Sequence, residues 1–148
     1  MKKNILLFLF LFFSSNIIAQ KKAFVIFDSD GNQTTYQELV NQSEEADIVL
    51  FGELHDNPIN HWLQLELTKD LFNNSEKLVL GAEMMESDNQ LVIDEYITGM
   101  VSVSKLKSET KIWPNFKTDY LPLIQFSKQN KLSFIATNVP RRYASIVY

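Results

Sequence analysis

The stretch DIVLFGELHDNPINHW, Asp47 to Trp62, decides the fold that we predict for this chain. Residues 47–51 form an almost continuous apolar run, which is typical of a strand buried on both faces of a parallel sheet. Asn57 and Pro58 supply a good N-cap and a good first helical residue, so a helix is expected to begin there. A buried strand, a polar turn and a helix together make one unit of an α/β protein.

The same unit recurs along the chain. Two later apolar runs, residues 78–82 and 132–137, are predicted as further buried strands, and an earlier strand is expected at Ala23–Phe27 before a turn at Asp28–Asn32. Ser87 and Gln90 have the spacing of a capping box. The helices are expected at residues 34–46, 57–74, 88–99, 102–109 and 119–130, with another beginning after residue 138.

This alternation predicts a three-layer α/β fold, with a mostly parallel sheet and flanking helices. The last residues, YASIVY at 143–148, are apolar and contain no helix stop signal. We therefore expect the chain to be truncated, as the N-terminal part of a longer domain.

The N-terminus has the pattern of a signal peptide. Lys2 and Lys3 precede an apolar block at residues 5–13, and cleavage is expected after Ala19 or Gln20. A membrane anchor is the alternative, but the block is shorter than the ~20 residues that span a bilayer. The prediction is a leader at residues 1–20, a domain at 21–148, and export to the periplasm or the outer membrane.

Composition excludes several classes of protein. Without the two leader lysines, 12 basic residues remain against 18 acidic ones, a net charge of −6 that argues against nucleic-acid binding. The chain has no cysteine, so it cannot be a lipoprotein, form a disulfide or bind a metal through thiolates.

Polar residues follow three of the predicted strands. Glu53 and His55 come after the first, Glu83 after the second and Asn138 after the third. Ligands of open parallel sheets bind outside the carboxyl ends of the strands, so these four residues are expected to share one crevice. Glu53 directly follows a buried run and therefore needs a cation, a metal or a hydrogen-bond donor as its partner.

His55 is the leading candidate for chemistry, because an imidazole there can ligate a metal or haem iron, or move protons. His61 falls in the first turn of the predicted helix, and its spacing from His55 is not that of a helical metal pair. Arg141 and Arg142 at a helix N-terminus suggest an anionic partner. Phenolate ligands for ferric iron are available if they line the crevice, at Tyr120, Tyr143 and Tyr148.

Four segments, in order, resemble the ChaN-like haem-binding uptake family of the Tiki/TraB/EreA superfamily. FGELHDNPINHWLQLEL resembles the family's GE-x-HDNP-x-HH-x-x-Q signature, with Asn60 in place of the first histidine of the pair. The other three segments are LVLGAEMMESDNQ, IWPNFKTDYLPLIQFSKQ and FIATNVPRRYAS. The resemblance runs from about Phe24 to the C-terminus.

The resemblance implies an exported α/β protein that binds haem, through tyrosine or histidine, in iron acquisition. It also implies a domain about twice as long, whose later part would hold a second G-x-x-H in metal-dependent relatives. The expected partners are haem, a second subunit and an outer-membrane or periplasmic transport system. The haem-binding candidates are His55, His61, Asn138, Arg141 and Tyr143.

Two other functions stay open at this point. One is a metal-dependent hydrolase, in which Glu53, His55 and Glu83 bind zinc or manganese, or one glutamate acts as general base. The other is a truncated module that only interacts with partners. Haem binding is the leading hypothesis.

Overall fold

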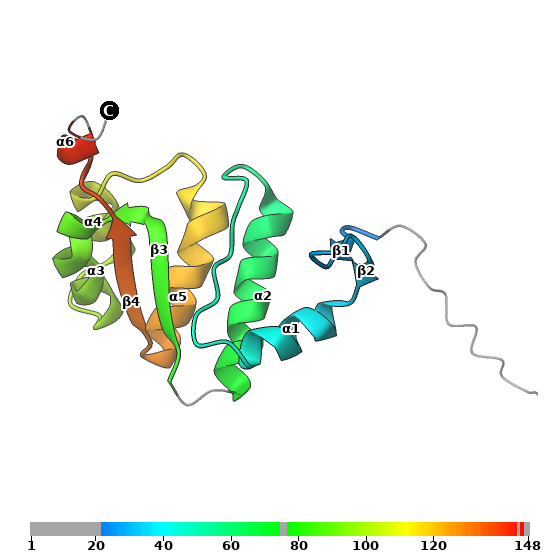
Figure 1. Ribbon diagram of the computed structural model, residues 1–148. Coiled ribbons are helices and arrows are strands. Elements are labelled where there is room, and N and C mark those ends of the chain that lie inside the picture. Colours follow the sequence, from blue (N-terminus) through cyan, green and yellow to red (C-terminus); the bar gives the residue numbers. More distant parts are fainter. Residues whose placement is uncertain (1–21, 75–76, 145, 147–148) are drawn as a thin grey trace, which may run out of the picture.

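The computed structural model describes residues 22–74, 77–144 and 146, and the predicted leader lies outside them. Within this part of the chain the strands form two separate two-stranded sheets (Figure 1). Strands β1 (Ile26–Phe27) and β2 (Gln33–Thr34) make an antiparallel hairpin around the predicted turn. Strands β3 (Val79–Glu86) and β4 (Ser133–Asn138) pair in parallel, as the strand–helix alternation predicted.

The helices lie close to their predicted positions. Thr35 caps the first helix, because its Oγ1 accepts a hydrogen bond from the Glu38 amide at 3.1 Å. Asn57 caps the second in the same way, with its Oδ1 2.9 Å from the Ile59 amide. The helices are α1 (Tyr36–Glu44), α2 (Pro58–Asn74), α3 (Gln90–Ile97), α4 (Val103–Glu109), α5 (Leu121–Asn130) and α6 (Arg141–Ala144), with a 3-10 turn η1 (Ser87–Asn89) and a π-helical turn η2 (Phe116–Tyr120).

The capping box predicted at Ser87 and Gln90 does not form. Gln90 instead turns its amide toward β4, where its Nε2 donates to the Phe134 carbonyl and its Oε1 accepts from the Ala136 amide, both at 2.8 Å. A side-chain amide has the donor and acceptor of a peptide group, so Gln90 satisfies two backbone groups of β4 as a neighbouring strand would.

The buried strand predicted at residues 47–51 is wrong. This segment belongs to neither sheet, and Ile48 and Leu50 are 78% and 91% exposed. Strand β3 pairs only with β4 among the described residues, so residues 47–51 form no ladder with it. An apolar run indicates residues that favour burial, but a strand is buried only where other elements pack against it.

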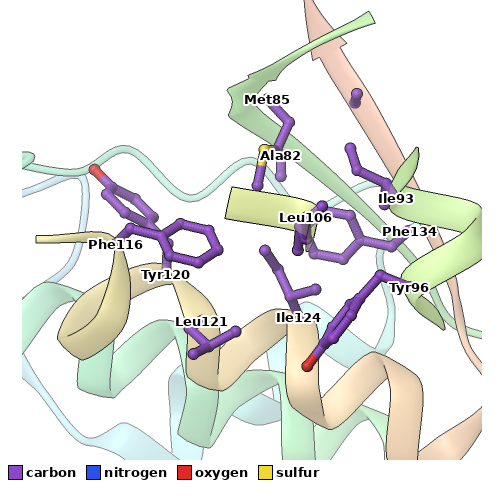
Figure 2. Close-up of a cluster of buried hydrophobic side chains, with 11 residues drawn as sticks. Ala82, Met85, Ile93, Tyr96, Leu106, Phe116, Tyr120, Leu121, Ile124 and Phe134 are labelled. Atoms are coloured by element: carbon purple, nitrogen blue, oxygen red, sulfur yellow. The ribbon is translucent and has the colours of Figure 1, made fainter. Parts of the chain in front are cut away.

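The main core lies between the β3–β4 sheet and helices α3, α4 and α5 (Figures 1 and 2). Side chains alternate along the strands, so Ala82, Phe134 and Ala136 face this core, whereas Val79 and Ile135 are about half exposed on the other face. Eleven buried residues form the cluster: Ala82, Met85, Ile93, Tyr96, Leu106, Phe116, Tyr120, Leu121, Ile124, Phe134 and Ala136.

The α/β class is therefore confirmed, as is a parallel sheet with flanking helices, although this sheet has only two strands among the described residues. The three-layer arrangement and the truncation stay predictions. None of the helices in the described ranges is long and apolar enough to cross a bilayer.

Candidate functional site

Glu53 and His55 are in direct contact in the loop that leads into α2. His55 Nδ1 lies 3.1 Å from Glu53 Oε1, so the two side chains point toward each other at the start of the turn. The two residues differ in exposure, because the Glu53 side chain is 14% exposed and that of His55 is 55% exposed. The pair thus presents an imidazole to the surface on a carboxylate that is largely buried.

Two neutral side chains also hold the Glu53 carboxylate. The Tyr120 hydroxyl, at the end of η2, donates to Glu53 Oε1 at 2.8 Å, and Gln64 Nε2, on α2, donates to Oε2 at 2.7 Å. Figure 2 shows the ring of Tyr120 at the edge of the core, with its hydroxyl oxygen pointing away from the other side chains. The partner that a buried Glu53 needed is therefore a set of hydrogen-bond donors.

These contacts determine the charge of the site. Burial raises the pKa of Glu53, but the hydrogen bonds from Tyr120, Gln64 and His55 and the nearby His61 outweigh burial and leave the pKa below its ordinary value. Burial and the hydrogen bond to Glu53 raise the pKa of Tyr120 well above its usual range. At neutral pH Glu53 is therefore an anion, and Tyr120 is a neutral phenol that serves as a donor.

The charge of Glu53 fixes the tautomer of His55. An ionised carboxylate only accepts hydrogen bonds, so the proton of a neutral His55 lies on Nδ1. Nε2 then carries a lone pair on an exposed ring. The Trp113 ring packs against this imidazole edge to face, with the ring centroids 4.8 Å apart, and orients it further.

His61 lies behind this pair, with a side chain that is only 2% exposed. Its Nε2 is 3.0 Å from the His55 carbonyl oxygen and therefore donates to it. Its Nδ1 lies 3.3 Å from Glu53 Oε2, within ion-pair distance, but the angle does not make a hydrogen bond. Its ring also packs on Tyr120, with centroids 4.6 Å apart. His61 thus supports the loop from inside.

Asn115 completes the support of the loop. Its Nδ2 donates to the His55 carbonyl at 2.7 Å and to Asp119 Oδ2 at 2.7 Å. The His55 carbonyl therefore accepts from Asn115 as well as from His61, which holds the backbone at His55 on two sides.

No role was predicted for Gln64 or Asn115, although Gln64 matches the glutamine that ends the family signature, and Tyr120 was considered as an iron ligand. Gln64 had a signal, because it lies one helical turn after His61 and therefore on the same face of α2. Tyr120 had none, since 67 positions separate it from Glu53 and only the packing of η2 against α2 brings them together.

Glu83 and Asn138 make no hydrogen bond or ion pair with this pair among the described residues, and the crevice that all four were expected to share stays a prediction. Glu83 lies within β3 on its exposed side, and no hydrogen bond or ion pair joins it to Glu53 or His55 in the described part of the chain. Asn138 pairs in register with Glu86 at the end of the sheet. Among the residues placed by the structure, no three His, Asp or Glu side chains are grouped to hold a metal ion.

A second polar cluster gathers residues that follow β3 and β4. The Arg141 amide donates to Glu86 Oε2 at 2.9 Å, and the Arg142 guanidinium pairs with Asp88 and lies over the Tyr143 ring. This cluster borders a polar cavity of about 240 Å³ that His55 does not line. The predicted haem residues Arg141 and Tyr143 thus lie here, apart from the pair at Glu53.

Fold and site together define an α/β protein that presents a surface imidazole on a buried carboxylate. The family model described as haem-binding uptake, Tiki superfamily, ChaN matches residues 39–148, and the chain belongs to this family. The matched range includes Glu53 and all of its partners. No curated protein and no solved structure matches the chain.

Proposed function

We propose that this protein binds haem through His55, as an exported component of an iron-uptake system. The observation that carries the proposal is the His55–Glu53 pair, which keeps a proton on Nδ1 and leaves Nε2 free on an exposed ring. Metal-ligating histidines commonly donate their second ring N–H to a carboxylate, which sets their tautomer and orientation.

The residues around His55 fit the needs of haem. A histidine is a common axial ligand of haem iron, and a porphyrin also needs apolar surface for its flat faces. Leu54 and Trp113 supply such surface next to His55, since both are exposed apolar side chains. The bound haem would supply an iron that accepts the Nε2 lone pair.

Membership of the family supports the haem ligand, and the predicted leader at residues 1–20 supports export. Arg141 and Tyr143 of the second polar cluster, and Asn138 at the end of β4, remain candidates for contacts with the propionates or the iron. His61 would not contact the haem directly, since its ring is buried against Tyr120, and would instead hold the backbone at His55.

Titration of the purified protein with haemin tests this function. We expect a saturable shift of the Soret band for the wild type and its loss in His55→Ala, because no other described imidazole is exposed. Asp56→Ala, on the adjacent exposed residue, is the matched control and should bind as the wild type does. An unchanged shift in His55→Ala would contradict the proposed ligand, and Tyr143→Phe then tests the alternative one.

A further inference from the structure

Three donors share the two oxygens of Glu53. Oε1 accepts from His55 Nδ1 at 3.1 Å and from the Tyr120 hydroxyl at 2.8 Å, whereas Oε2 accepts from Gln64 at 2.7 Å. Tyr120 and Gln64 therefore draw on the negative charge that would otherwise polarise the imidazole.

The environment makes this sharing effective. Tyr120 is almost fully buried, and Glu53 and His61 have little exposed side-chain surface. Interactions between charged and polar groups are stronger where water is excluded, and hydrogen bonds in a chain polarise one another. The Glu53 carboxylate thus polarises the His55 imidazole through one hydrogen bond, and water screens this interaction little on the buried side.

A carboxylate that accepts from Nδ1 shifts electron density onto the imidazole and raises the basicity of Nε2. A more basic, partly anionic ligand stabilises the more highly charged metal ion. Because ferric and ferrous haem differ by one charge at the iron, such a ligand binds the ferric form in preference.

Resting on the proposed function, we propose that this site selects ferric over ferrous haem, and that Tyr120 and Gln64 set the degree of selection. Glu53 strengthens His55 as a ligand for Fe(III). Tyr120 and Gln64 are positioning residues that hold the carboxylate and moderate its effect. The residues act through His55 and do not touch the haem themselves.

Redox titration of the haemin-loaded full-length protein measures this selection. The midpoint potential of bound haem, compared with that of free haemin in the same buffer, gives the ratio of ferric to ferrous affinity. In Glu53→Gln, which removes the charge, we expect this ratio to fall about tenfold, or about 59 mV for a one-electron couple. In Tyr120→Phe we expect it to rise about threefold, because Oε1 is left to His55 alone.

A matched control uses another buried tyrosine. Tyr96 belongs to the same core cluster and lies under Lys128, and among the described residues no hydrogen bond joins it to Glu53 or His55, so Tyr96→Phe should keep the wild-type ratio. If Tyr120→Phe does not fold, as judged by circular dichroism, Gln64→Leu replaces it, since it also frees the carboxylate and should raise the ratio.

Opposite shifts in Glu53→Gln and Tyr120→Phe support the proposal, because a loosened loop would move both variants in one direction. If haem binds but both variants keep the wild-type ratio, or both shift the same way, the selection mechanism is overturned while haem binding stands. If the wild type does not bind haemin saturably, the proposed function and this inference fail together.

Discussion

The two histidines lie six residues apart in the chain but have different roles. His55 presents an exposed ring, whereas the His61 ring is buried between Tyr120 and Glu53 and holds the His55 carbonyl. This division follows from their positions, since His55 lies in the loop and His61 is on the inner face of the first turn of α2. One histidine is the proposed ligand, and the other fixes its backbone.

The need of Glu53 for a partner was predicted, because an acidic residue after an apolar run is costly when unpaired. The pairing expected for His55 was with Glu83, whereas the structure pairs it with Glu53. The residues that support this pair could not be predicted. Asn115 and Tyr120 reach the pair from 60 and 67 positions away, through the packing of the segment before α5. Contacts of this kind depend on tertiary structure and leave no local pattern.

The loop support at Asn115 leads to a prediction at the scale of a single residue. Asn115→Ala removes the hydrogen bond to the His55 carbonyl but leaves the imidazole in place. We expect haemin affinity to fall about threefold to tenfold, the loss typical of one hydrogen bond. Titration measures it, with Asn130→Ala as control, because Asn130 also donates to a backbone carbonyl but lies away from the site. Equal affinity in both variants would argue against support by Asn115.

At the scale of elements, caps and helical periodicity predicted the helices well, because these signals are local. The parallel pairing of β3 and β4 also followed, since each predicted strand was separated from the next by helices. The strand prediction for residues 47–51 was wrong for a reason that lies outside the segment. Its apolar residues were suited to a sheet, but no described strand pairs with it.

One contact between elements gives a prediction on stability. The Tyr36 hydroxyl on α1 donates to Asp70 Oδ2 on α2 at 2.7 Å. Tyr36→Phe should lower the free energy of unfolding by about 1 kcal/mol at pH 8. The exposed Tyr143→Phe is the control, and it should change stability by less than about 0.5 kcal/mol.

The Tyr36 contact should also weaken at alkaline pH. Burial and the hydrogen bond to Asp70 raise the pKa of Tyr36 in the folded protein. Its stabilising effect is therefore complete below the ordinary tyrosine pKa near 10, and is lost as pH rises above it, because the unfolded chain ionises first. Urea unfolding at pH 8 and pH 11 should show a smaller difference between wild type and Tyr36→Phe at pH 11. An equal difference at both would contradict the pKa assignment.

At the scale of the whole molecule, the core lies on one face of the β3–β4 sheet, and the His55–Glu53 pair is held by the segments that flank it. Helix α2 supplies His61 and Gln64, and the turn before α5 supplies Asn115 and Tyr120. The family match covers all these elements. Two segments far apart in sequence thus hold the proposed ligand site on a short α/β framework.

The central claim is that His55 is the iron ligand, and resonance Raman spectroscopy of the reduced haem complex tests it most directly. An iron–histidine stretching band should be present in the wild type and in Tyr143→Phe, and absent in His55→Ala. A band that persists in His55→Ala, or a wild-type haem complex without one, would contradict the claim.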